Sequence, residues 1–137
     1  MKGYDKSFDT SFKQIYDTQM SNQEMMLRCN KYDSFSDKCK GDGKYAKLPH
    51  DDVRLASYNI QQLMSEVGEV LDADKRWKNF RNEKYDRESK LEEIADCFIV
   101  LMNISMFSGF SGQEVASAIL KKIDVVREGI LKEANKK

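Results

Sequence analysis

The spacing of apolar residues in the middle of the chain constrains its fold more than any other feature. A series of them recurs at steps of three and four: Val53, Ala56, Ile60, Leu63, Val67 and Val70. This is the period of an amphipathic helix, and Asp51 or Asp52 can cap its first turn. Pro49 is the single proline and precedes this helix, so long uninterrupted helices can follow. The pattern predicts an all-α protein.

Three further helices are predicted around this one. They run from about Ser7 to Lys31, from about Leu91 to Ser105 and from about Gly112 to Ala134. Turn residues favour an irregular connection over 32–49, and residues 75–87 predict a loop or a short helix. We therefore expect an all-α bundle of four to five helices in which the third helix is central. The 137 residues fit a single domain, with an N-terminal helix and irregular loop over 1–50 and the helices of the candidate site over 51–134.

The composition excludes several functional classes. The 23 basic and 23 acidic residues cancel, so no overall field favours nucleic acid as a partner. Cys29, Cys39 and Cys97 show no CxxC spacing and are odd in number, which favours a reducing cytoplasm over a disulfide framework. His50 is the single histidine, which argues against a zinc site or a Ser-His-Asp triad. No apolar run is long enough to span a membrane, so we expect a cytoplasmic protein with no membrane partner.

Two carboxylate pairs stand at helical spacing on successive predicted helices. Glu66 and Glu69 form the first pair, and Glu93 and Asp96 the second. Residues i and i+3 share a helix face, so four carboxylates converge if the two helices pack antiparallel. Unpaired carboxylates would repel one another and lose solvation, which favours a site around divalent cations. Oxygen ligands suit Mg²⁺, with Mn²⁺ as a possible substitute.

The same acids are also compatible with other interpretations. Lys75, Arg76 or Arg127 could neutralise them in structural ion pairs. A ferritin-like metal carrier would use Glu-x-x-His pairs, and these helices contain no histidine. A P-loop is absent, because Gly41-Asp42-Gly43 lacks both a preceding strand and a following lysine–hydroxyl pair.

The order of motifs resembles a known family. An ExxE pair, a short connection, an ExxD pair and then a basic residue on the last helix are similar to the MazG and dimeric dUTPase superfamily, and the resemblance covers about Leu55 to Arg127. It implies that Glu66, Glu69, Glu93 and Asp96 are the catalytic, metal-binding carboxylates. It also implies Mg²⁺-dependent hydrolysis of a nucleoside triphosphate to a nucleoside monophosphate and pyrophosphate by a homodimer or homotetramer, in nucleotide-pool metabolism or sanitation.

The same resemblance suggests substrate-binding residues. Trp77 and Lys78 match a K.W-type element of dimeric dUTPases, although Trp77 could equally be a core or interface anchor. Lys122 and Arg127 could reach phosphate oxygens, and Asn103 could bind a base or sugar or be a satisfied buried asparagine.

Two positions depart from the family pattern, because Ser65 replaces an acid often assigned to water activation and Asp124 stands at an asparagine. The alternative function is a non-enzymatic helical oligomer that acts as a regulatory or interaction module.

Overall fold

The computed structural model describes residues 6–29, 31–32, 47–78 and 84–136. These contain four α-helices, α1 (Lys6–Arg28), α2 (Val53–Ala73), α3 (Arg87–Phe107) and α4 (Gly112–Ala134), and the short 3₁₀ helix η2 (Lys75–Trp77). The described residues form no strand beyond one isolated bridge between Asp51 and Ser108. The all-α prediction is confirmed. Helix α3 begins earlier than expected because the Asp86 side chain accepts hydrogen bonds from two backbone amides of its first turn.

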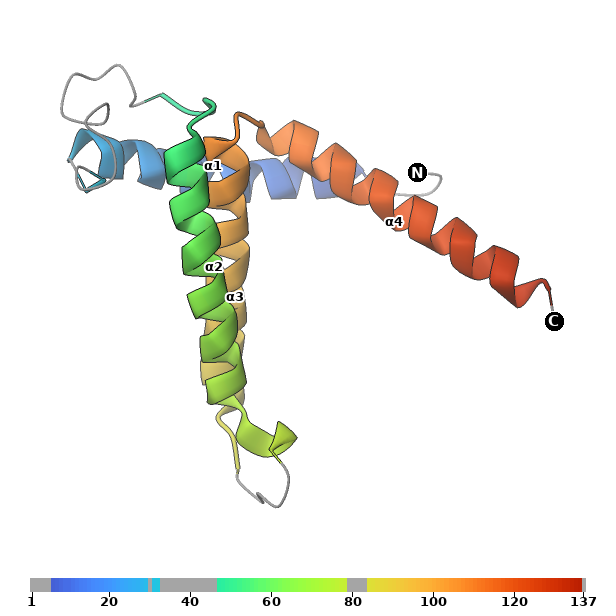
Figure 1. Ribbon diagram of the computed structural model, residues 1–137. Helices are drawn as coiled ribbons and strands as arrows, with labels where there is room; N and C mark the ends of the chain where they lie inside the picture. Colours follow the sequence, from blue (N-terminus) through green and yellow to red (C-terminus); the bar gives the residue numbers. More distant parts are fainter. Residues whose placement is uncertain (1–5, 30, 33–46, 79–83, 137) are drawn as a thin grey trace.

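Local signals fix where α2 and α4 begin. Asp52 caps α2 by accepting from the amides of Arg54 and Leu55, both at 3.1 Å. Ser111 and Glu114 form a reciprocal capping box at the start of α4. Between α3 and α4 the chain turns at Gly109, whose φ of +87° favours glycine. Helix α4 leaves this turn at a sharp angle to α3 (Figure 1).

The helices form an open arrangement (Figure 1). Helices α2 and α3 lie side by side and antiparallel, and α1 crosses the end of this hairpin where α2 begins and α3 ends. Helix α4 leaves from the same end, packs on α1 and diverges from the hairpin. The expected bundle is therefore not closed within one chain. The sequence pattern shows which helices have apolar faces but not whether the same chain covers them.

The core gathers where the hairpin meets α1. It consists of buried side chains from α1, α2, α3 and the adjoining connections: Tyr16, Leu27, Tyr32, Leu48, Leu55, Ala56, Met102, Met106 and Phe107. Gly112 lets α4 approach α1 closely, because a Cβ there would lie 3.0 Å from the Cβ of Tyr16. The Tyr16 hydroxyl donates to the carbonyl of Phe110 at 2.7 Å. The far end of the hairpin extends beyond this core.

The prediction that the apolar stripe of α2 forms its core face is partly wrong. Val53, Ile60 and Val67 are exposed, whereas Leu55, Ala56 and Asn59 are buried. The reason is that α2 packs mainly on α3, which leaves an adjoining apolar face uncovered. Helix α3 packs on α2 and α1 but also exposes Leu91, Phe98 and Leu101. No helix among the described residues is long and apolar enough to cross a membrane.

Candidate metal centre

Two glutamates extend the buried faces of α2 and α3 outward from the core. Glu66 follows the buried Asn59 by two helical turns, and Glu93 precedes the buried Val100 by two turns. Residues two turns apart share a helix face, so each glutamate lies on the face that packs against the other helix. The packing that buries the core therefore brings the two acids together.

Three of the four predicted carboxylates converge. One carboxylate oxygen from each of Glu66, Glu69 and Glu93 lies within 4.8 Å of the others. Asp96 is exposed and lies outside this group, although it is close enough to raise the pKa of both Glu66 and Glu93. We call Glu66, Glu69 and Glu93 the carboxylate cluster.

The cluster is electrostatically strained without a cation. Burial, followed by the neighbouring Glu69, raises the pKa of Glu66. Glu69, followed by burial, raises the pKa of Glu93. Both shifts oppose ionisation, because a carboxylate in this position loses solvation and meets like charge. Burial also raises the pKa of the adjacent Cys97 thiol.

The cluster has the chemistry of a divalent-cation site. Oε2 of Glu66 and Oε2 of Glu93 are shielded from solvent and accept no hydrogen bond from any described residue. No lysine or arginine in the described part of the chain forms an ion pair with the cluster. Buried carboxylate oxygens normally have a partner, and an all-oxygen set suits Mg²⁺ or Mn²⁺. The residues present therefore fit such an ion.

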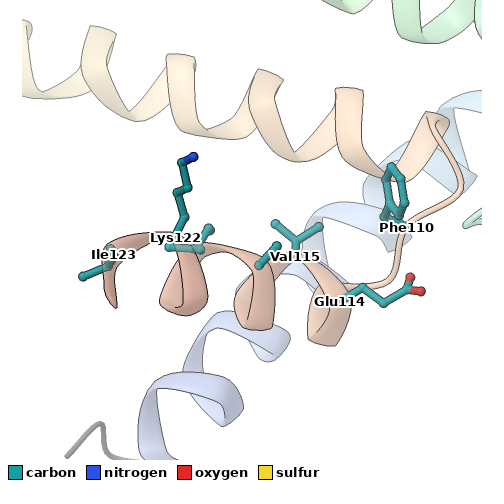
Figure 2. A pocket seen from close by; sticks show the side chains of 7 residues that line it. Phe110, Glu114, Val115, Lys122 and Ile123 are labelled. Atoms are coloured by element: carbon teal, nitrogen blue, oxygen red, sulfur yellow. The ribbon is translucent and has the colours of Figure 1, made fainter. Parts of the chain in front are cut away.

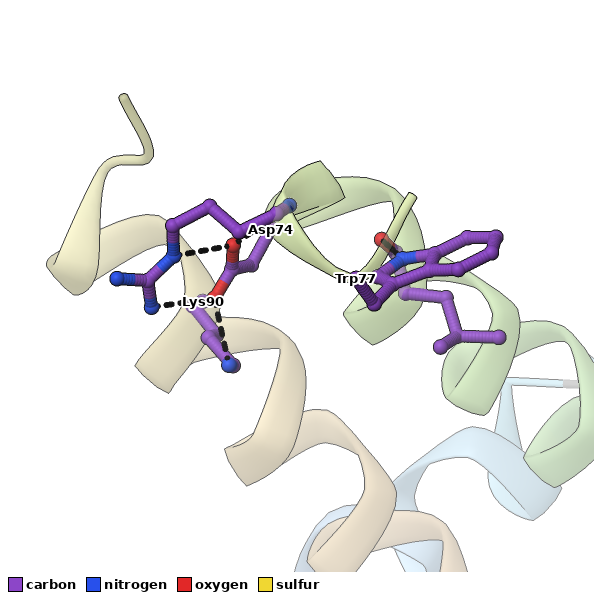
Figure 3. A network of polar contacts seen from close by, with 5 residues as sticks. Asp74, Trp77 and Lys90 are labelled. Atoms are coloured by element: carbon purple, nitrogen blue, oxygen red, sulfur yellow. Dashed lines mark hydrogen bonds and ion pairs between the residues drawn. The ribbon is translucent and has the colours of Figure 1, made fainter. Parts of the chain in front are cut away.

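A second acidic site lies at the far end of the hairpin (Figure 3). The Asp74 carboxylate accepts hydrogen bonds from Arg76 Nε at 2.8 Å, Arg76 Nη2 at 2.7 Å and Lys90 Nζ at 2.9 Å. The guanidinium of Arg76 lies 3.6 Å from the centre of the Tyr85 ring. These cations hold the pKa of Asp74 well below its usual range. We call Asp74, Arg76, Tyr85 and Lys90 the hairpin lock.

The sequence pattern does not indicate the hairpin lock as a site. Arg76 is a possible ion-pair partner of the carboxylate cluster by sequence, but its guanidinium is bound to Asp74. A weak signal exists, since Asp74 directly follows α2 and Lys90 lies in the first turn of α3. The ion pair between Asp74 and Lys90 depends on the packing of α2 against α3, which the sequence alone does not show.

Trp77 and Lys78 lie beside the hairpin lock rather than at the carboxylate cluster. The Trp77 side chain is 57% exposed, and its Nε1 donates to the carbonyl of Leu71 at 3.0 Å. Lys78 Nζ lies 5.4 Å from the centre of the Trp77 ring. Trp77 is therefore no core anchor within one chain, and its exposed ring can stack on a base or pack against another surface.

Asn103 belongs to a buried chain of amides. Its Nδ2 donates to Asn59 Oδ1 at 3.2 Å, and its Oδ1 accepts from Gln19 Nε2 at 2.9 Å. Asn59 in turn donates to the carbonyl of Leu55 at 2.8 Å. These hydrogen bonds connect α1, α2 and α3. Neither Gln19 nor Asn59 stands out in the sequence pattern. The surroundings of Asn103 therefore match those of a buried asparagine with its hydrogen bonds satisfied.

Lys122 and Arg127 lie on α4 and are not brought to the cluster within one chain. Both side chains are exposed, and α4 diverges from the α2–α3 hairpin (Figure 1). Lys122 lines a cavity of about 570 Å³ on α4 (Figure 2). The other lining residues are mostly apolar: Phe110, Glu114, Val115, Ala118, Ile119 and Ile123.

The fold and the cluster define an all-α protein whose α2–α3 hairpin carries a cluster of three carboxylates. Residues 56–128, more than half of the chain, match the family model of the MazG nucleotide pyrophosphohydrolase domain. The chain therefore belongs to the MazG nucleotide pyrophosphohydrolase family. The matched region contains the carboxylate cluster, the hairpin lock and most of α4, and leaves α1 outside. No curated protein and no solved structure matches the chain.

Proposed function

We propose that this protein hydrolyses a nucleoside or deoxynucleoside triphosphate to the monophosphate and pyrophosphate, with Mg²⁺ or Mn²⁺ as cofactor. The observation that carries the proposal is the carboxylate cluster, in which three acids from two helices meet without a cation among the described residues. Membership of the MazG family supports a nucleotide substrate.

In the proposed reaction, Glu66, Glu69 and Glu93 would hold the divalent ion, and Asp96 would add negative charge beside them. When bound, such an ion would neutralise phosphate charge and lower the pKa of a coordinated water. A water oxygen bonds to the α phosphorus, and the bond from that phosphorus to the oxygen bridging the α and β phosphates breaks. Pyrophosphate leaves with the electrons of this bond, and the attacking water gives up its proton. Ser65 carries no carboxylate, so the proton would pass to one of the neighbouring acids or to solvent.

We further propose that the active form is a homodimer or homotetramer. Helix α4 exposes much of its apolar face, including Ile123, Val126 and Ile130, and the mostly apolar cavity beside Lys122 suits a packed helix better than a triphosphate. Lys122 and Arg127 lie on α4, which diverges from the hairpin that carries the cluster in the same chain. A second copy could both cover the apolar face and bring such cations near a bound triphosphate.

The test is a screen of common ribo- and deoxynucleoside triphosphates with Mg²⁺, in which pyrophosphate and orthophosphate are quantified separately. We expect pyrophosphate and a monophosphate from at least one substrate, and loss of both products in Glu69→Ala. Orthophosphate with a diphosphate would assign a different reaction class. Absence of turnover by an oligomer that binds no metal would favour the alternative, a non-enzymatic helical interaction module.

A further inference from the structure

The hairpin lock lies next to the carboxylate cluster on both helices. Lys90 precedes Glu93 by three residues on α3, which places it about 4.5 Å away along the helix axis. Asp74 directly follows the end of α2, whose last turns carry Glu66 and Glu69. The two acidic sites are therefore successive contacts between the same pair of helices.

The two contacts act in opposite directions on the helix pair. Like charges on Glu66 and Glu69 of α2 and on Glu93 of α3 repel across the interface, which favours separation of the helices. The Asp74–Lys90 ion pair attracts across the same interface, with 2.9 Å between Nζ and Oδ2. The Asp74 side chain is only 7% exposed, so solvent screens this attraction less than that of a surface pair.

The remaining members of the lock hold Asp74 in place. Arg76 binds both carboxylate oxygens and donates its backbone amide to Oδ1 at 3.2 Å. The ring centre of Tyr85, which precedes α3, lies 3.6 Å from the Arg76 guanidinium carbon. The Asp74 carboxylate is thus fixed relative to α2. Its ion pair with Lys90, and the contact of Arg76 with Tyr85, connect it to the start of α3.

We propose that Asp74 and Lys90 are positioning residues of the metal centre, whose ion pair holds α2 and α3 at the separation at which Glu66, Glu69 and Glu93 bind a divalent ion. The inference rests on the proposed function, because it assumes that the cluster binds metal. Ligands held in place before the ion arrives bind it more tightly than ligands that must first be brought together.

The experiment measures Mn²⁺ affinity by calorimetry in the full chain, together with nucleotide turnover as a function of Mn²⁺ concentration. The test variants are Lys90→Met, which keeps the side-chain length without the charge, and Asp74→Asn, which keeps the shape. Lys90→Arg preserves the cation. Lys13→Met and Asp17→Asn are matched controls, because they remove an exposed ion pair with 2.5 Å between Nζ and Oδ2 from α1.

We expect Lys90→Met and Asp74→Asn to bind Mn²⁺ roughly 10- to 100-fold more weakly, as is usual when residues supporting metal ligands are removed. Their turnover should recover at high Mn²⁺ concentration. Lys90→Arg and both controls should resemble the wild type. A merely structural role would lower the thermal midpoint but leave the Mn²⁺ affinity of the folded variants unchanged.

Two failures can be distinguished. If the wild type binds no Mn²⁺, the proposed function fails. If the wild type binds Mn²⁺ and the lock variants bind it equally well below their thermal midpoints, the positioning role is overturned and the metal centre stands. An equal loss in the Lys13 and Asp17 controls would also overturn it. Should Lys90→Met fail to fold, Asp74→Asn against Asp17→Asn gives the same comparison.

Discussion

One helical hairpin carries two acidic sites in opposite electrostatic states. Asp74 is bound by two cations, which hold its pKa below the usual range. Glu93, about one turn after Lys90, and Glu66, more than two turns before Asp74, have raised pKa values and buried oxygens without a hydrogen-bond partner among the described residues. Basic residues are thus available to the hairpin, but Arg76 and Lys90 bind the other acid. Among the described residues, the cluster therefore has no basic side chain as a partner although such side chains lie nearby. This is expected of a site that binds a cation from solution.

The largest expected effect tests whether the cluster performs the chemistry. Glu69→Ala removes the acid that lies close to both Glu66 and Glu93. We expect turnover to fall by at least about 100-fold, beyond the range usual for residues that only support metal ligands. The helical content should be preserved, because the change relieves repulsion. Steady-state pyrophosphate release and far-ultraviolet circular dichroism measure the two outcomes.

Glu92→Ala is the matched control for this experiment. Glu92 is an exposed neighbour of Glu93 on the same helix and lies outside the cluster, so its loss should leave turnover nearly unchanged. If Glu69→Ala instead unfolds while Glu92→Ala does not, the cluster has a structural role and its contrast with Asp74 disappears.

The next effect concerns the stability that metal confers. An ion that binds only the folded state at 100 times its dissociation constant adds about 2.7 kcal/mol to the free energy of unfolding. Mg²⁺ should therefore raise the thermal midpoint of the wild type and of Asp17→Asn, but not that of Glu69→Ala. An equal rise in Glu69→Ala would mean that Mg²⁺ binds elsewhere. Differential scanning fluorimetry over a Mg²⁺ titration gives this comparison.

The sequence predicted the carboxylate cluster better than the hairpin lock, and the reason is physical. The cluster depends on helical periodicity, which places Glu66 and Glu69 on one face whatever the surroundings. The lock depends on which residues meet when α2 and α3 pair, and a lone Asp74 carries no such information. The helices themselves followed from apolar spacing and caps such as Asp52.

Which apolar face is buried was harder to predict. The wide stripe on α2 includes both the buried Ala56 and the exposed Ile60 and Val67, and periodicity does not separate a face covered by α3 from a face left uncovered in one chain. The buried amides Asn59 and Asn103 were missed as a pair for a related reason. Their value lies in the hydrogen bond that they form across two helices, which the sequence alone does not reveal.

A smaller expected effect on the kinetic constants tests whether base recognition lies beside the hairpin lock and the chemistry at the carboxylate cluster. If the exposed Trp77 stacks on the base, Trp77→Ala should mainly raise KM, by about 5- to 150-fold, since stacking on an aromatic contributes roughly 1–3 kcal/mol. Trp77→Phe should retain most of the affinity. Arg127→Ala should instead lower kcat/KM for every nucleotide alike, because phosphate is common to them. Steady-state kinetics over several bases separates these results.

The opposite outcome for Trp77 is equally specific. An unchanged substrate profile with a shift in elution from a sizing column would make Trp77 an interface anchor. Base recognition would then lie elsewhere and not at Asn103, because that side chain is buried and hydrogen-bonded to Asn59 and Gln19.

The smallest expected effect is the opposite dependence of stability on pH at the two sites. A raised folded-state pKa means that Glu66 and Glu93 stabilise the metal-free protein below their unfolded pKa of about 4.3, and that this contribution is lost as pH rises through the folded value. A lowered pKa means that Asp74 stabilises above about pH 3.9 and loses its contribution as pH falls. Glu66→Gln should therefore flatten the stability profile above about pH 4, and Asp74→Asn should lower stability near neutrality while matching the wild type in strong acid. Urea unfolding in chelator across this range measures both. Parallel profiles for the two variants would show that the sites do not differ in charge state.

Added Mg²⁺ should abolish the loss of wild-type stability above about pH 4, because a bound cation favours the ionised carboxylates.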